Sequence, residues 1–227
     1  MQLLDPSKIP HFLLNEIKQK EKTFITTTTI TAECLMECAG LQCARFLIQY
    51  LPQTTIHIIC GKGNNGADGL TIARHLKLAK KNVIVYLINN QSQFLGLAKK
   101  QLTRCKKLNI PIKKITTLTK NIKANDLLIE ALMGIGLKNN LSTEKTAIIE
   151  ALNTLTAFKC SIDIPCGCFD DMNIQRSVFF KPNITLSLGY PKQLFQQFPY
   201  SFGTIYLINI SLPDFIEPNL FEIKINY

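Results

Sequence analysis

The sequence predicts an α/β fold, a Rossmann-like three-layer α/β/α sandwich with a mostly parallel central sheet. Short apolar runs alternate with helical segments of about ten to fifteen residues, which is the pattern of parallel βαβ units. A glycine-rich stretch, GKGNNGADG, lies between one such run and a helix. The hydrophobic content of 46% over 227 residues suits a globular domain with a substantial core.

These elements alternate along the whole chain, so residues 1–227 are expected to form a single domain. Expected helices cover residues 11–22, 31–50, 70–79, 92–108 and 142–155. Expected strands cover residues 56–60, 83–88, 112–115, 126–132 and 203–209, with further strands in the runs that begin at Cys160 and Thr185. The threonines at 26–29 are expected to resist helix formation and to cap the next helix. The segment 213–227 has no assignable pattern.

Composition and charge argue against several classes of protein. The net charge of +10 comes from scattered lysines without interleaved aromatic residues, which favours a solvated surface over a nucleic-acid interface. No window approaches 18 uninterrupted apolar residues, and the N-terminus is too charged for a signal peptide, so we expect a cytoplasmic protein without membrane segments. The eight cysteines include no C-x-x-C pair and are expected to be reduced core residues rather than zinc ligands.

The glycine-rich stretch carries the main functional signal. It follows an expected strand and precedes a helix, whose N-terminal N–H groups and dipole favour a phosphate. Gly61, Gly63 and Gly66 formally satisfy G-x-G-x-x-G, but Asn89 and Asn90 stand where a dinucleotide-binding acid is expected, about 20 residues later. This disfavours an ordinary NAD dehydrogenase. The stretch also lacks the Gly-Lys-Ser/Thr that closes a P-loop.

Polar residues accompany these glycines. Asn64, Asn65 and Asp68 supply hard oxygen donors, which suit a cation or sugar hydroxyls. The alternative is a tight turn in which Asp68 caps the following helix.

Two further acids lie near the carboxyl ends of expected strands. Asp163 interrupts an apolar run, where an acid is costly unless it is paired or performs chemistry, and it is the leading catalytic candidate. Glu130 and the loop Gly134–Asn140 lie at the strand edge where open parallel sheets bind ligands. An ordinary strand-end acid is the alternative for Glu130, and a solvent-facing turn lysine is the alternative to a site role for Lys192.

Five motifs resemble one known family. GKGNNGADGLTIARHL closely resembles the signature loop of the NAD(P)H-hydrate epimerase family (the YjeF N-terminal domain), whose usual form is GxGNNGGDG. Ala67 replaces a glycine there, which is acceptable if its φ is negative. The segments LMECAG, EALMGIGL, DIPCG and TLSLGYPK resemble LMExAG, DALFGTGL, DIPSG and TVTFxxPK of the family, in the same order. The resemblance covers residues 31–213.

The resemblance implies an isomerase of metabolite repair that interconverts the R and S epimers of hydrated NADH and NADPH. It implies that Asp163 is the acid–base group and that Lys192 assists it. The substrate-binding residues would be Asn64, Asn65, Gly66, Ala67, Asp68, Gly134, Ile135, Gly136, Leu137, Lys138, Asn139, Asn140 and Asp163. It also implies a homodimer and, as pathway partner, a separate ADP- or ATP-dependent dehydratase.

A potassium ion is a further implication, with Asn65, Glu130 and Cys166 as its ligands. Glu130 is one methylene longer than the family's aspartate, and Cys166 replaces a serine with a thiol that suits a hard cation poorly. These departures leave a second function open, a non-catalytic nucleotide- or RNA-binding dimerisation module of the same fold.

Overall fold

A computed structural model describes residues 2–53, 55–117, 122–134, 141–170, 178–198, 201–213 and 222–225. Within these residues nine strands form one sheet, in the spatial order β1-β9-β8-β7-β6-β5-β2-β3-β4. Their bounds are β1 Gln2–Leu4, β2 Thr55–Cys60, β3 Asn82–Leu87, β4 Ile112–Lys114, β5 Leu127–Ala131, β6 Phe158–Ile162, β7 Ile184–Leu188, β8 Thr204–Ile208 and β9 Glu222–Ile225. The β8–β9 pair is antiparallel and the other neighbouring pairs are parallel, which confirms the mostly parallel sheet.

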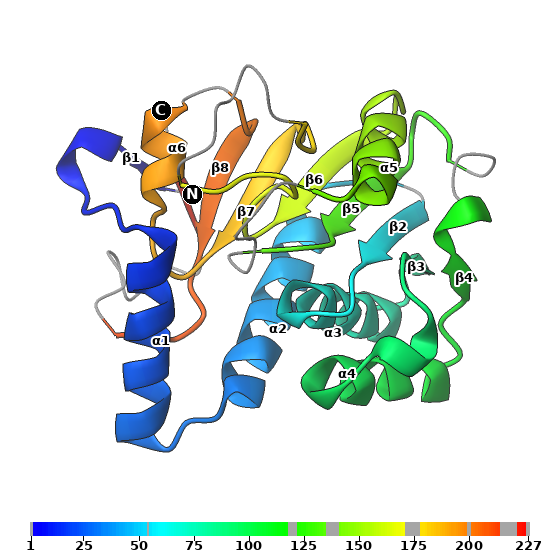
Figure 1. The fold of residues 1–227 in the computed structure, drawn as a ribbon, viewed down its shortest axis with the longest axis horizontal. Coiled ribbons are helices and arrows are strands. Elements are labelled where there is room, and N and C mark those ends of the chain that lie inside the picture. The colour runs from blue at the N-terminus through cyan, green and yellow to red at the C-terminus, as the bar shows by residue number, and fades with distance from the viewer. Residues whose placement is uncertain are drawn as a thin grey trace.

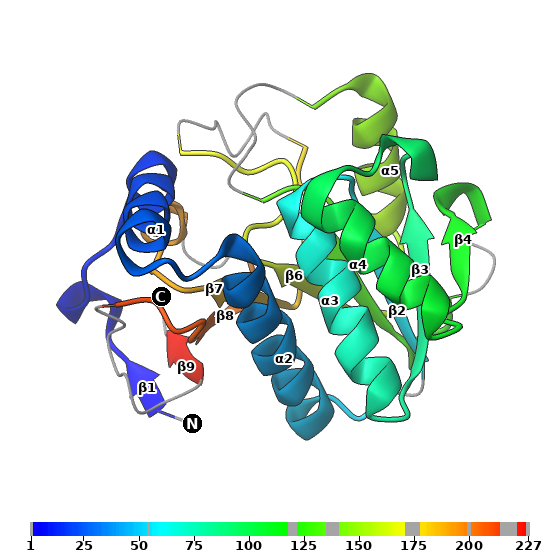
Figure 2. The same cartoon turned by 90° about the horizontal axis from the view of Figure 1, so that it is seen from below.

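The helices cover both faces of this sheet (Figure 1). Their bounds are α1 Leu14–Thr28, α2 Ala32–Tyr50, α3 Asn64–Leu78, α4 Gly96–Lys107, α5 Thr143–Asn153 and α6 Gln193–Gln197. Helices α2, α3 and α4 lie on one face, and α5 and α6 lie on the other. Helix α1 stands beside the sheet, and a short loop joins it to the start of α2 (Figure 2). Among the described residues, no helix is both long and apolar enough to cross a membrane.

Alternate residues of each central strand pack into two apolar cores, one on each face of the sheet. In β2, Ile58 and Cys60 pack into the core under α2, α3 and α4, whereas Ile59 packs into the core under α5. In β5, Ile129 packs into the core under α2, α3 and α4, and Leu128 packs into the core under α5. Side chains alternate across a strand, so a sheet covered on both faces needs apolar residues at every position. This requirement explains the unbroken apolar runs of the sequence.

The threonine segment differs from expectation, because Thr26, Thr27 and Thr28 belong to α1. Their hydroxyl groups donate hydrogen bonds to the carbonyl oxygens of Lys22, Thr23 and Phe24, one turn back in the helix. These bonds satisfy the hydroxyls inside a helix and offset the low helix propensity of β-branched residues. The prediction that this segment resists helix is therefore wrong. The expected cap by these threonines is wrong as well, because Thr31, two residues after the segment, caps α2: its Oγ1 accepts a bond from Cys34 N at 3.2 Å.

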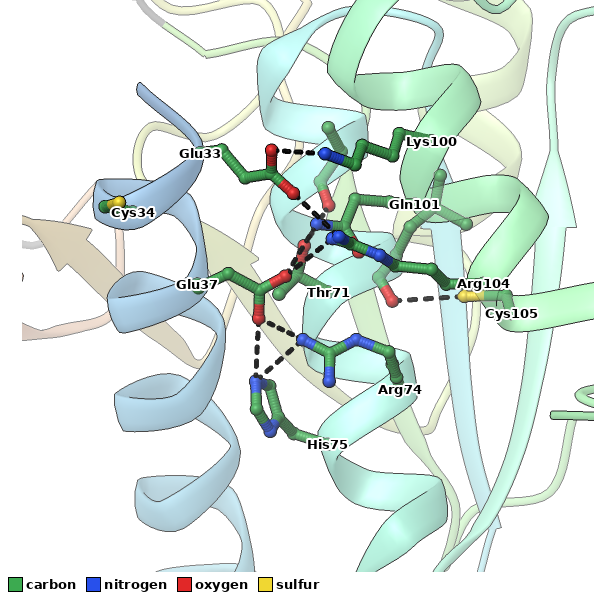
Figure 3. A network of polar contacts seen from close by, with 12 residues as sticks. Glu33, Cys34, Glu37, Thr71, Arg74, His75, Lys100, Gln101, Arg104 and Cys105 are labelled. Carbon is green, nitrogen blue, oxygen red and sulfur yellow. Dashed lines mark hydrogen bonds and ion pairs between the residues drawn. The ribbon is translucent and has the colours of Figure 1, made fainter. Parts of the chain in front are cut away.

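Charged side chains fasten the three helices of one face together (Figure 3). Glu37 on α2 pairs with Arg74 on α3 and accepts bonds of 2.9 Å from both Gln101 and Arg104 on α4. Burial raises the pKa of Glu37, but Gln101 and the guanidinium groups of Arg74 and Arg104 together hold it below its usual range. Glu33, one turn earlier, pairs with Lys100 and Arg104. The acid of the LMECAG motif therefore holds α2 against α3 and α4.

Candidate functional site

The order of the strands places a crevice at one point of the sheet. Strands β2 and β5 are neighbours, but the chain leaves β2 toward β3 and leaves β5 toward β6, on opposite sides. The connections after β2 and β5 therefore diverge at the carboxyl ends of these strands, which is where open α/β sheets bind ligands. The segments involved are Gly61–Gly63 and Leu132–Gly134.

Two glycines allow the backbone to pack closely at this crevice. A Cβ on Gly61 would overlap the carbonyl oxygen of Leu132, which follows β5. A Cβ on Gly66 would overlap the carbonyl oxygen of Gly61. Open space surrounds Gly63 by contrast, so a side chain at that position would meet no atom within 4 Å.

Helix α3 begins inside the glycine-rich stretch, at Asn64, with Gly63 as its N-cap. Asn64, Asn65 and Gly66 therefore present their N–H groups in the first turn, where a helix offers no internal partners. Ala67 has helical geometry, so its φ is negative as its replacement of glycine requires. The expected loop is thus the first turns of a helix, and Asp68 lies inside the helix instead of capping it.

Asn65 is buried without a partner. The residue retains 6% exposure, and neither its amide oxygen nor its amide nitrogen has a hydrogen-bond partner among the described residues. An unsatisfied buried amide costs about 1–3 kcal/mol. A Cβ on Gly134 would lie 3.5 Å from Asn65 Cγ and 3.1 Å from Asp163 Oδ2, so the three residues meet at one point. The arrangement suits a ligand that supplies the missing hydrogen bonds.

The sequence predicted Asp163 inside a strand, but β6 ends at Ile162 and Asp163 is the first residue after it. Its φ of 68° is in the left-handed region, and Ile164 N closes a three-residue turn by donating to Ile162 O at 3.0 Å. Such a turn is rare and strained for a residue with a side chain. The turn is held by a bond of 2.8 Å from Asp163 N to Leu186 O on the neighbouring β7.

Lys192 is the partner of this acid. Its Nζ lies 2.7 Å from Asp163 Oδ1 and also donates to Ser187 Oγ at 2.9 Å and to Leu188 O at 2.6 Å. The lysine is fully buried, whereas the Asp163 side chain keeps 13% exposure. The backbone of Phe12, just before α1, pairs with the segment around Lys192. Lys192 is therefore not the solvent-facing turn lysine of the alternative interpretation.

A cavity of about 700 Å³ opens in front of these groups. Helices α1 and α2, the first turns of α3, the end of β7 and the segments after β2, β3, β5, β6 and β8 contribute to its walls. Of the residues expected to bind substrate, the cavity is lined by Asn64, Asn65, Asp68, Gly134 and Asp163, while Gly66 and Ala67 are buried behind it. Ile135, Gly136, Leu137, Lys138, Asn139 and Asn140 lie outside the described residues.

Several charged residues of the wall were not predicted. Glu21 projects from α1, and burial, followed by the charge of Asp163, raises the pKa of Glu21 to about 7 although Lys192 lowers it. Burial, Asp163 and Glu21 likewise raise the pKa of Asp68 well above its usual range. The cavity is also lined by four lysines, Lys18, Lys22, Lys62 and Lys145. The residue pattern could have shown that α1 is amphipathic, but not that it faces this cavity.

Of the three expected potassium ligands, only Asn65 lines the cavity. Glu130 Oε1 accepts a bond from Leu132 N at 2.6 Å, and Oε2 accepts bonds from Ser161 Oγ at 2.9 Å and Cys166 N at 3.1 Å. Burial raises the pKa of Glu130 to about 7 despite these donors. Burial, followed by the charge of Glu130, also raises the pKa of the Cys166 thiol. Both residues lie outside the cavity wall, and no group of three or more acidic, histidine or cysteine side chains among the described residues could hold a metal ion.

Comparisons with known proteins agree with this architecture. The model of the family described as YjeF-related protein N-terminus matches residues 32–194. The chain is 28% identical over 210 residues to an NAD(P)H-hydrate epimerase of Rhodopirellula baltica, covering 91% of this chain and 86% of that protein. It is 29% identical over 207 residues to an NAD(P)H-hydrate epimerase of Elusimicrobium minutum, covering 87% and 94%.

Two further comparisons concern a longer relative and a solved structure. A bifunctional NAD(P)H-hydrate repair enzyme of Thermofilum pendens is 30% identical over 209 residues, which cover 88% of this chain and 40% of that protein. A crystal structure of a yeast protein superposes with a TM-score of 0.76 at 24% identity, covering 87% of this chain and 88% of the other, and supports the fold. The family match spans well over half of the chain, so the chain belongs to the YjeF-related protein N-terminus family.

Proposed function

We propose that this protein is an NAD(P)H-hydrate epimerase, an isomerase that interconverts the R and S epimers of hydrated NADH and NADPH. Relatives that match most of the chain carry this name. The observation that carries the proposal is Asp163, which pairs with the buried Lys192 and faces a 700 Å³ cavity beside the unpartnered Asn65. A cavity of this size is within the usual range for small-molecule sites.

The chemistry needs proton transfer at one oxygen atom. The two epimers differ at C6 of the hydrated nicotinamide ring, so inversion requires the hydroxyl to leave, or the ring to open, and to return from the other face. A carboxylate that donates and accepts a proton performs this step without oxidation or reduction. Asp163 is the proposed acid–base group. Lys192 fixes its orientation and balances its charge at 2.7 Å.

The remaining residues are proposed to hold the dinucleotide. The free N–H groups of Asn64, Asn65 and Gly66 at the start of α3 suit a phosphate. The unsatisfied amide of Asn65 suits a ribose hydroxyl or the ring carboxamide, since it can both donate and accept. The lysines in the wall favour an anionic ligand. Ala67, Asp68 and the loop Gly134–Asn140 complete the proposed substrate site.

Potassium, a homodimer, a single domain over residues 1–227 and a cytoplasmic location stay predictions of the sequence and the resemblance. The orphaned oxygen of Asn65 fits a cation, but Glu130 and Cys166 as arranged do not, so no step of the proposed reaction passes through an ion. The bifunctional repair enzyme of T. pendens matches this chain over two-fifths of its length. A dehydratase that consumes one epimer remains the proposed pathway partner.

The test uses the two epimers of hydrated NADH, separated by chromatography. The purified protein should equilibrate either epimer far faster than buffer alone, and Asp163→Asn should abolish this acceleration. Equal rates with and without the protein would overturn the proposal. A thermal-shift screen distinguishes the alternative module, because stabilisation by RNA and not by NADP-type ligands would favour it.

A further inference from the structure

Glu21 brings a carboxyl group to the cavity from an element that contains none of the predicted site residues. Helix α1 is anchored by the buried side chain of Ile17 and by a 3.0 Å bond from Leu14 N to the carboxylate of Asp170. Glu21 and Ile25 follow Ile17 at intervals of four residues, so all three lie on one face of the helix. Both Glu21 and Ile25 line the cavity.

The charged groups around Glu21 come from several elements. Asp163 after β6 and Lys192 before α6 act on it electrostatically, and Glu21 in turn acts on Asp68 of α3. The other charged groups that line the cavity are Lys18, Lys22, Lys62 and Lys145. Lys192 is engaged with Asp163, Ser187 and Leu188. Glu21 makes no hydrogen bond or ion pair with any residue that the structure describes, so its carboxyl group is available to a ligand.

Asp163 and Glu21 therefore share one cavity in opposite electrostatic settings. The ammonium of Lys192 lies 2.7 Å from Asp163 Oδ1 and pairs with this carboxylate. Glu21 lacks such a partner, and burial together with Asp163 raises its pKa to about 7. Two carboxyl groups that share a site but have different surroundings divide acid and base roles in some enzymes. The unpartnered amide of Asn65, 6% exposed in the same cavity, independently indicates that a ligand belongs there.

We propose that Glu21 is the general acid of the epimerisation and Asp163 the general base, an inference that rests on the proposed function. Glu21 transfers its proton to the C6 hydroxyl, the C6–O bond breaks, and the N1 lone pair forms a C6–N1 double bond as water departs. A water molecule then adds to C6 from the other face and gives its proton to Asp163. Solvent returns a proton from Asp163 to Glu21, so the reaction consumes and produces no protons.

The test compares Glu21→Gln with Glu21→Asp and with Glu16→Gln, an exposed residue of the same helix. Initial rates of epimerisation of hydrated NADH are measured between pH 6 and 9, and thermal unfolding checks that each variant is folded. In the wild type, kcat/KM should fall as pH rises through about 7, where Glu21 of the free enzyme loses its proton. Glu21→Gln should lower kcat by about a hundredfold or more with little change in KM, and the remaining rate should no longer fall through this range.

Glu21→Asp should restore part of the rate together with its pH dependence, and Glu16→Gln should match the wild type. If the wild type is active but Glu21→Gln is equally fast, Glu21 is not the general acid. The same conclusion follows if Glu21→Gln is slower but keeps the pH profile of the wild type. Either result would leave the proposed function standing. A wild type that does not accelerate epimerisation would overturn the proposed function, and the role of Glu21 with it.

Discussion

Replacing Lys192 with methionine should destabilise the protein, because it leaves Asp163 without a counter-charge. Methionine fills a similar volume but removes the ion pair and the hydrogen bonds to Ser187 Oγ and Leu188 O. Breaking a buried pair from one side costs about 3–5 kcal/mol. The Asp163 side chain is 13% exposed and keeps some hydration, so we expect the lower end of this range, about 3 kcal/mol.

A double-mutant cycle isolates the pair itself. Asp163→Asn should cost about 4 kcal/mol, since it leaves the charge of the fully buried Lys192 unbalanced. The double variant removes both charges, so its loss should be smaller than the sum of the two single losses by about 2 kcal/mol. Lys181→Met, at an exposed position, is the control and should change stability by less than about 0.5 kcal/mol.

Urea unfolding followed by circular dichroism measures these free energies. A loss of about 3 kcal/mol also corresponds to a fall of about 6–12 °C in Tm for a chain of this size. The assignment of a stabilising buried pair would be refuted if the unfolding free energy of Lys192→Met were within about 0.5 kcal/mol of the wild type. Strictly additive losses in the double-mutant cycle would refute it as well.

Three further predictions concern packing, pH and ions. Gly66→Ala should lose about 3 kcal/mol or more in urea unfolding because its Cβ would overlap Gly61, whereas Gly63→Ala should be nearly neutral; equal losses would contradict the close approach at Gly66. Glu37→Gln should lose about 1–2 kcal/mol at pH 7. The folded protein holds the pKa of Glu37 below its unfolded value, so the loss of stability in Glu37→Gln should be present above about pH 4 and vanish as the pH falls through the folded pKa. A loss that does not change with pH would contradict the ion pairs of Glu37 shown in Figure 3. If potassium binding requires Glu130, exchange of sodium for potassium should leave Tm unchanged, since this carboxylate is occupied by protein donors; a potassium-specific rise would show that the ion binds without Glu130 or displaces those donors.

Local chemistry allowed the centre of the site to be predicted. The glycines before α3 and the acid after β6 violate the rules for ordinary strands and helices, and such violations gather at functional sites. Asp163 could be singled out because an acid in an apolar run needs a partner. The parallel order of the strands followed from the alternation of apolar runs and helices, and it brings Asp163 to the same edge as Asn65.

The features that the sequence did not predict depend on contacts between segments that are far apart in the chain. Glu21 belongs to an amphipathic helix whose position depends on contacts with segments about 150 residues away, such as the bond from Leu14 to Asp170. The orientation of Glu130 likewise depends on donors from Ser161 and Cys166, which come from a different βα unit. The terminal strands β1 and β9 pair with each other at the sheet edge, and three- and four-residue strands have too little pattern to be recognised.

A crystal structure with a bound nicotinamide dinucleotide would locate the substrate site. We expect the phosphates at the first turn of α3 and the nicotinamide ring between Asn65, Gly134 and Asp163, with the Asn65 amide hydrogen-bonded to the ligand. A nucleotide bound elsewhere, for example over Arg74 and Arg104, which pair with Glu37, with the Asn65 amide still unpartnered, would contradict this expectation.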